Sequence, residues 1–477
     1  MTSGSWLLRC SSWSEGEVTG LVQGTQVADE LVGVQEGVSR LLGIDGLTVV
    51  RVDVDAVGAR VVHVVTEESV PPGCPTCGVV STAPRGRVCT RPRDVPYGDA
   101  AVRLVWHKRR WRCREPGCPR GSFTESLPAI PARARLTVRL RREVGAAAAD
   151  RFSCVSAAAG HYAVSWPVAN TALLTHIAGP LGEPLPTVAV LGVDETRRGK
   201  PVWEQDPKTG KWRIVHDRWH TGIVDAVGSS GLLAHVEGRT CQAVVDWLTE
   251  QPQPWRDAVT HVCIDLSASY AKAVREGLPQ AVIVADRFHL VRLANDMVTE
   301  VRQRVTREHY GRRGRKADPA WVSRRRLLTG YPRLSEEGFV RMWNGLIDTG
   351  EAGIEILHAY TVKEDLRALL ALAGTQPSRC QIAARLERFY LRAASCPAPE
   401  AHRLAQTIEA WWPAIEAGLV TGYSNARSEG YNRLAKHVGR DAFGFRNITN
   451  QRQRIRWACT RQHRRESPAK TELPGQV

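Results

Sequence analysis

The chain has 477 residues, of which 43% are hydrophobic and 24% charged, and its formal net charge is +16. These proportions are typical of a globular protein, and no apolar run is long enough to span a bilayer. The first 19 residues lack the basic-then-apolar order of a secretory signal, so we expect a cytoplasmic protein without membrane attachment. In that reducing compartment the twelve cysteines are expected to be thiols or metal ligands rather than disulfides. The length predicts two to four folding units.

Basic residues are concentrated in three segments. Residues 108–120 hold six basic side chains against one acid, residues 300–326 hold ten against three, and residues 446–466 hold seven against one. Any single segment is as consistent with a solvated helix face as with nucleic-acid binding. Their repetition favours contacts with phosphates, so we expect DNA as a partner.

The amino-terminal part is predicted to be rich in strands. Residues 1–40 are an extension to which we assign no function. Within residues 41–127, alternating apolar residues predict two strands and a turn over 47–65 and a further strand around 102–106. Pro128 and Pro131 then predict a linker.

Two close cysteine pairs lie within this β-rich module: Cys74 with Cys77, and Cys113 with Cys118. Such spacing is typical of two knuckles that bring four thiolates to one tetrahedral zinc ion, which would be structural because protein fills all four positions. Four reduced, buried cysteines are the alternative. Two rival ligands, Cys89 and His107, lie between the pairs.

The second knuckle follows a cluster of basic residues that the finger would present to DNA: Lys108, Arg109, Arg110 and Arg112. The same residues are also consistent with a packed rim of the finger.

Residues 132–180 have the sequence pattern of a helix-turn-helix DNA-binding domain. Small residues over 155–165 precede a second helix over 166–176, which Ser165 would cap and in whose first turn Pro167 fits. An ordinary helical hairpin in a core would look similar.

From residue 187 the pattern changes to an α/β region. Strands are predicted over 188–193, 221–225, 232–236, 259–264 and 281–285, with helices over 241–250 and 270–276. Residues 228–231 predict a hairpin between the second and third strands. An all-helical insertion at about 290–420 interrupts this domain, which runs over 187–460, and residues 461–477 form a basic tail.

Three apolar runs of this region end in aspartate: Asp194, Asp265 and Asp286. Residues at strand ends gather at one edge of an open sheet, so these acids are expected to converge. Carboxylates that hold two Mg²⁺ ions support phosphoryl transfer. For any one of them, a turn or a helix cap is the simpler explanation.

Specific motifs resemble the ISL-three family of bacterial insertion-sequence transposases from about Leu41 to about Trp457. They include the paired cysteines and the runs 42–47, 192–195, 286–289, 424–436 and 444–447. The resemblance implies a zinc finger and a helix-turn-helix ahead of a ribonuclease-H-like catalytic domain of the DDE type. It also implies binding of terminal inverted repeats and target DNA, metal-dependent cleavage and strand transfer, and a homo-oligomer on DNA.

Carried over residue by residue, the resemblance makes Asp194, Asp265 and Glu429 the catalytic acids and the ligands of two Mg²⁺ or Mn²⁺ ions. Asp286 and His289 are candidates for a supporting role, in which Asp286 would assist a metal or orient His289.

A helix that begins near Ser424 or Asn425 would place Glu429 at the head of one face. That face continues with Asn432, Arg433, Lys436 and Arg440. A metal ligand followed by three DNA-binding cations accounts for the whole face, whereas a simple Glu–Arg pair leaves the last two cations unexplained.

Two other functions remain open at this point. One is a DNA-binding regulator, derived from a transposase, that keeps the finger and the helix-turn-helix but is catalytically silent. The other is a metal-dependent nuclease that does not join strands.

Overall fold

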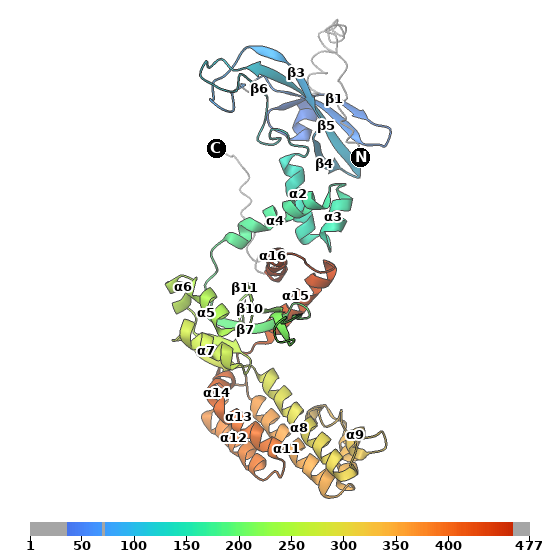
Figure 1. Cartoon of the computed structure of the whole chain (residues 1–477), viewed down its shortest axis with the longest axis vertical. Coiled ribbons are helices and arrows are strands. Elements are labelled where there is room, and N and C mark those ends of the chain that lie inside the picture. The colour runs from blue at the N-terminus through green and yellow to red at the C-terminus, as the bar shows by residue number, and fades with distance from the viewer. Residues whose placement is uncertain (1–35, 69–71, 461–477) are drawn as a thin grey trace. The chain divides into compact units, whose positions relative to one another are not determined.

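The computed structural model describes residues 36–68 and 72–460. The chain divides into two compact units, which meet between Gly179 and Pro180. In the described part of the chain, no helix is both long and apolar enough to cross a membrane. Figure 1 shows the elements of both units and labels many of them.

The first unit contains a six-stranded sheet built around one long strand, β5 (Ala100–Arg112). That strand pairs in parallel with β2 (Arg60–Thr66) and antiparallel with three others, and β1 (Leu47–Val54) extends the sheet beyond β2. The three antiparallel partners are β3 (Pro84–Thr90), β4 (Arg93–Tyr97) and β6 (Ser122–Thr124). The strands β1, β2 and β5 were predicted, whereas β3, β4 and β6 were not.

The predicted linker at residues 128–131 is wrong. Leu127 and Ile130 are 8% and 1% exposed and pack into the apolar core of the first sheet with Leu104 and Trp106. The two prolines therefore shape a segment that covers the sheet.

Three helices complete the first unit: α2 (Val138–Asp150), α3 (Val155–His161) and the part of α4 (Trp166–Gly182) that precedes Pro180. Thr137 caps α2 by accepting a hydrogen bond from the Leu140 amide, as the residue types favour. A Cβ added at Gly145 would lie 2.5 Å from the carbonyl oxygen of Ala172, so α2 and α4 pack closely there. Pro167 lies in the first turn of α4, as predicted.

The second unit is organised around a five-stranded sheet in the order β11-β10-β7-β12-β13. Its strands are β7 (Val190–Arg197), β10 (Trp219–Asp225), β11 (Leu232–Glu237), β12 (His261–Ile264) and β13 (Val282–Ala285). The strand β10 is antiparallel to both of its neighbours, whereas β7, β12 and β13 run parallel. All five predicted strands are present, and β7 extends four residues further than expected. A separate ribbon of β8 (Val202–Gln205) and β9 (Trp212–His216), which was not predicted, is inserted between β7 and β10.

Helices cover both faces of this sheet. One face packs on α5 (Cys241–Thr249), α6 (Gln253–Asp257) and α7 (Ala268–Gly277), through Val244, Trp255 and Val274. The other packs on α15 (Ala426–Asp441) and α16 (Ile448–Cys459), through Ala435 and Ile455. The sheet is thus buried on both sides, which accounts for its nearly continuous apolar strands.

Between β13 and α15 the chain is helical. The elements are α8 (Arg287–Tyr310), α9 (Pro319–Val322), a 3-10 turn (Tyr331–Arg333), α10 (Glu336–Ile347), α11 (Glu351–Leu370), α12 (Arg379–Ala394), α13 (Pro399–Ala410) and α14 (Trp412–Thr421). Figure 1 shows these helices gathered into one bundle. They share a large apolar core of their own.

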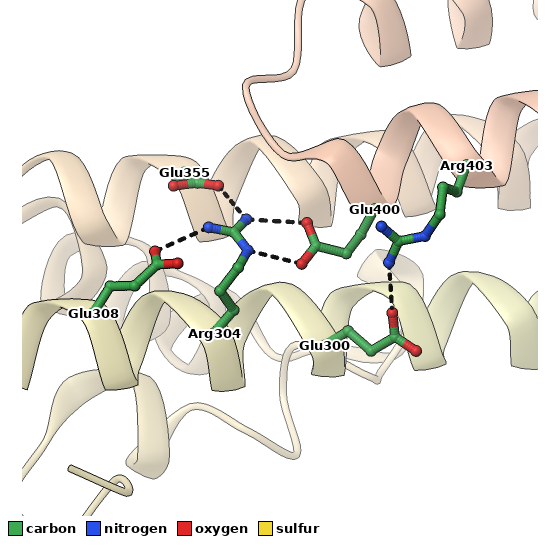
Figure 2. Close-up of polar contacts among 6 residues, drawn as sticks. All are labelled: Glu300, Arg304, Glu308, Glu355, Glu400 and Arg403. Carbon is green, nitrogen blue, oxygen red and sulfur yellow. Dashed lines mark hydrogen bonds and ion pairs between the residues drawn. The ribbon is translucent and has the colours of Figure 1, made fainter. Parts of the chain in front are cut away.

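Part of the basic segment 300–326 serves this bundle rather than an external partner. Arg304 on α8 donates to both carboxylate oxygens of Glu400 at 2.8 and 3.0 Å and to Glu355 at 2.5 Å, joining three helices. Figure 2 shows this network beside the separate pair of Arg403 with Glu300, which are 3.0 Å apart. Arg304 therefore stabilises the bundle itself and is not available for a contact with DNA.

Candidate active site and zinc finger

The four predicted zinc ligands lie together in the first unit. The sulfurs of Cys74 and Cys118 are 3.9 Å apart and those of Cys77 and Cys113 are 3.5 Å apart, and all four atoms lie within 4.8 Å of one another. The first knuckle turns because the Gly78 amide donates to the Cys74 carbonyl at 2.8 Å, with Gly78 at a φ of +74°. This four-sulfur group fits a tetrahedral zinc ion.

The rival ligands are not part of that group. Cys89 on β3 pairs in register with His107 on β5, within the sheet, and neither belongs to the four-sulfur cluster. The Nε2 atom of His107 lies 3.1 Å from Nδ1 of His63 instead.

The basic residues beside the second knuckle do not share one environment. Lys108 is 4% exposed, with its Nζ 3.7 Å from the centroid of the Trp106 ring, and burial lowers its pKa to about 8. Arg109 is bound to the buried Glu125 at 2.6 Å. Both side chains are therefore engaged within the unit, whereas Arg110 and Arg112 are exposed.

In the second unit, the predicted acids come from four elements. Asp194 lies in the middle of β7, Asp265 directly follows β12, and Asp286 directly follows β13 and precedes α8. Glu429 lies in the first turn of α15. Since β7, β12 and β13 are adjacent parallel strands, the three aspartates occur at the same edge.

The tightest group at this edge consists of Asp265, Asp286 and His289, whose candidate ligand atoms lie within 4.8 Å of one another. The Nε2 atom of His289 is 3.1 Å from Oδ1 of Asp265 and 3.9 Å from Oδ2 of Asp286. Both of these carboxylate oxygens are buried, and in the described part of the chain neither accepts a hydrogen bond apart from the contact with His289. Asp194 and Glu429 are not members of this tight group.

Electrostatic coupling nevertheless links all four acids. Burial, and then the charge of Asp265, raises the pKa of Asp194 to about 7. Burial, and then the charge of Asp286, raises the pKa of Asp265 to about 7, and the Glu429 charge adds to the effect. Carboxylates held this close repel one another when they are ionised, and a divalent cation relieves that repulsion. These buried carboxylate oxygens fit a hard, oxygen-preferring cation.

The start of α15 is fixed against β7 by a close approach at Gly192. A Cβ there would lie 2.6 Å from both Oδ1 of Asn425 and Oγ of Ser428. Asn425 donates from its side-chain Nδ2 to the Val193 carbonyl at 2.9 Å. Its backbone N–H donates to the Asp286 carboxylate at 3.4 Å. This residue therefore joins α15, β7 and the acid that follows β13.

The face of α15 predicted to begin with Glu429 is divided between two roles. Asn432 donates from Nδ2 to Oδ2 of Asp194 at 2.6 Å, and its side-chain oxygen accepts from Thr196. Lys436 and Arg440 line a pocket beside β7, whereas Arg433 is exposed outside that pocket. The roles of Asn425 and Asn432 were not predicted, because the available signal was only their position around Glu429.

Comparisons with known proteins agree with the motifs. Residues 191–455 match the family model of ISL3-type DDE transposases, and residues 71–118 match the zinc-finger of the IS204, IS1001, IS1096 and IS1165 transposases. The chain is 24% identical over 375 residues to the transposase for insertion sequence element IS1001 of Bordetella parapertussis, covering 78% of this chain and 85% of that one. It is 28% identical over 206 residues to the transposase for IS1557 of Mycobacterium tuberculosis, covering 39% of this chain. That match spans 45% of the mycobacterial relative, less than half of its length.

Among solved structures, a Drosophila P element transposase strand transfer complex aligns at 9% identity and a TM-score of 0.37, covering 67% of this chain and 92% of that one.

Since the transposase model covers more than half of the chain, the chain belongs to the ISL3-type transposase family, and the resemblance drawn from the motifs is confirmed. Membership also identifies the four-cysteine module as the family's zinc finger.

Proposed function

We propose that the protein is the transposase of a bacterial insertion sequence, and that it cleaves and joins DNA with two Mg²⁺ or Mn²⁺ ions held by Asp194, Asp265 and Glu429. The observation that supports this most is the position of Asp194 and Asp265 on adjacent parallel strands, with raised pKa values for both and with the charge of Glu429 contributing to that of Asp265. Divalent ions bound there would activate the attacking oxygen and stabilise the leaving one in phosphoryl transfer.

The strand order β11-β10-β7-β12-β13 supports a ribonuclease-H-like catalytic domain over 187–460, interrupted by the helical bundle. The finger over 41–127 and the helices over 132–180, with α3 and α4 as the helix-turn-helix, would recognise the terminal inverted repeats. DNA-bound copies would act as a homo-oligomer. In this proposal the phosphates are contacted by Arg110, Arg112, Arg433, Lys436 and Arg440. Lys108 and Arg109 are omitted because their charges are engaged within the unit.

The chain's own residues have distinct tasks at this edge. Asn432 holds the Asp194 carboxylate through its amide, and Asn425 fixes the start of the helix that carries Glu429. Asp286 and His289 lie beside Asp265, and Oδ2 of Asp286 accepts no hydrogen bond from the described residues. Asp286 is thus a candidate ligand as well as a residue that orients His289.

The test is nicking and joining of terminal-repeat DNA in Mg²⁺. Alanine at Asp194, Asp265 or Glu429 should abolish both reactions and leave binding of the repeat intact, because the ions act on chemistry whereas cationic residues act on affinity. Full cleavage by the Glu429→Ala protein would remove that residue from the ligand set and leave Asp286 as its replacement.

A catalytically silent DNA-binding regulator is the competing function. It predicts repeat binding with no metal-dependent nicking by the parent protein. The buried Oδ2 atom of Asp286, which accepts no hydrogen bond from the described residues, argues against it, because such a group is costly to retain without a ligand.

A further inference from the structure

A pocket of about 620 Å³ lies in the second unit, between the sheet and the helices α15 and α16. Thr196 of β7 lines it and donates to Asn432, whose amide is bonded to Asp194 at 2.6 Å. The pocket is therefore two hydrogen bonds away from one of the proposed metal ligands.

Five cationic side chains line this pocket: Arg197, Arg198, Arg218, Lys436 and Arg440. Within residues 36–68 and 72–460, none of them has a carboxylate oxygen within 4.0 Å. Arg198 donates only to neutral acceptors, the side chain of Gln451 and, at 3.1 Å, the carbonyl of Phe445. Burial, and then the charge of Arg218, lowers the pKa of Arg198. The charge of Glu237 opposes this shift. The pocket thus concentrates positive charge with no carboxylate of the described residues in direct contact with it.

A buried histidine pair adds an unpartnered polar atom. His235 is 5% exposed, and its Nδ1 lies 3.2 Å from Nδ1 of His220. Both histidines line the pocket, and Nε2 of His235 is buried without a hydrogen-bond partner. Such an atom is usually satisfied in native proteins, so its presence here points to a ligand.

The ribbon of β8 and β9 begins and ends next to this cationic pocket, because Arg198 precedes β8 and Arg218 follows β9. Its root is closed where the Arg198 amide donates to the Arg218 carbonyl at 2.6 Å. Trp203 stands opposite Ile214, and Gln205 stands opposite Trp212. Directly paired residues and residues two apart share one face of a ribbon, so both tryptophans and Ile214 lie on the same side.

That side is uncovered. Trp203 is 50% exposed, Trp212 is 64% exposed and Ile214 is 45% exposed. Trp203 is five residues from Arg198, so their Cα atoms are at most roughly 18 Å apart, a span of a few nucleotides. An aromatic face beside unpaired cations is the combination with which proteins hold single-stranded nucleic acid, since bases stack on rings while phosphates meet the cations.

We propose that the pocket binds the phosphates of a single DNA strand and that the aromatic face of the β8–β9 ribbon stacks on the unpaired bases of that strand. The inference rests on the proposed function, since a strand held here would be one that enters or leaves the acids. It adds Arg197, Arg198, Arg218, Trp203 and Trp212 to the DNA-contacting residues.

The test is fluorescence anisotropy of the full-length protein with labelled oligothymidylate and with a duplex, in EDTA so that no cleavage occurs. The double variant Trp203→Ala, Trp212→Ala should bind oligothymidylate about tenfold or more weakly, with little change for the duplex. The double variant Arg218→Gln, Arg440→Gln should weaken binding and make the dependence of log affinity on log salt shallower by roughly 0.7 per lost contact.

Matched controls are Arg275→Gln, an exposed cation of α7, and Leu391→Ala, an exposed apolar residue of α12, both of which should bind like the parent. Phenylalanine at both tryptophan positions should restore most of the affinity, which a ribbon with a merely structural role would not require.

Normal oligothymidylate binding by the alanine ribbon variant overturns the stacking, and an unchanged salt slope in the pocket variant overturns the phosphate site. Equal losses for oligothymidylate and duplex overturn the single-strand assignment. The proposed function is judged separately, by nicking of repeat DNA in Mg²⁺. A parent that nicks while its ribbon variant binds normally refutes this inference alone.

Discussion

Without metal, the acid cluster should make the folded protein less stable as the pH rises. Burial and Asp286 raise the pKa of Asp265 from 3.8 to about 7. A carboxyl group whose pKa is higher in the folded state binds more protons there than in the unfolded state. The free energy of unfolding must then fall as the pH rises from about 4 through 7, and the loss is complete above pH 7.

The magnitude follows from the size of the shift. About three pH units correspond to roughly 4 kcal/mol. The Asp265 side chain is 20% exposed and its titration is shared with its neighbours, so solvent screening and coupling reduce this to roughly 2 kcal/mol. Asp265→Asn removes the charge but keeps a side-chain oxygen that can accept from Nε2 of His289, which lies 3.1 Å from Oδ1. We therefore expect Asp265→Asn to melt several degrees above the parent in EDTA at pH 8, and to melt with it near pH 4.

The assay is thermal melting in EDTA and in Mg²⁺ across this pH range. In Mg²⁺ the order should reverse, because the parent binds the cation and is stabilised by mass action. Asp225→Asn is the matched control on the same sheet: its carboxylate accepts from the amides of Val227, Gly228 and Ser230, so losing its charge should destabilise the protein. If Asp265→Asn melts below the parent in EDTA at pH 8, the electrostatic argument for a cation site is refuted.

Three further outcomes are expected. Gly192→Ala should lower nicking at least tenfold with repeat binding retained. The control Gly222→Ala should be active, because its added Cβ would have its nearest neighbour at 3.5 Å. Equal activity of the two variants would show that the start of α15 can shift freely. Arg304→Ala should lower the free energy of unfolding by roughly 3–5 kcal/mol, because the buried Glu400 loses its partner. Arg403→Ala breaks an exposed pair and should cost less than about 1 kcal/mol in the same denaturant titration. Similar losses for the two variants would contradict the distinction between the buried and the exposed pair, both of which Figure 2 shows. Elemental analysis should find one zinc per chain, lost when both cysteines of the second knuckle become serine; zinc retained by that variant would exclude the four-sulfur site.

The acids could be predicted from sequence because each aspartate follows a continuous apolar run, which is the pattern of a buried strand reaching a sheet edge. The tight association of Asp265 with Asp286 and His289 could not, since it depends on the pairing of β12 with β13. The pocket could not be predicted from the sequence either, because Arg198, Arg218 and Arg440 come together only through the packing of α15 on the sheet.

The burial of Lys108 is a different case, because the sequence contains a signal for it. Leu104, Trp106 and Lys108 are two residues apart along β5 and so share one face, and the first two are fully buried. Counting Lys108 as part of a basic run ignored this alternation. The methylene stem packs in the core and the ammonium group lies over the Trp106 ring, an arrangement that offsets part of the cost of burying the charge.

The helical bundle separates Glu429 from the other acids in sequence, yet it need not disturb their geometry. It begins at Asp286, which precedes α8, and it ends at Asn425, which precedes α15. The Asn425 amide contacts the Asp286 carboxylate at 3.4 Å across 139 positions of sequence. The last helix of the bundle, α14, packs back on β13, where a Cβ at Gly418 would lie 3.3 Å from the Val284 side chain. Because both ends of the bundle are fixed to the same strand, the position of α15 is set by β7 and β13, and the size of the bundle can vary without moving Glu429.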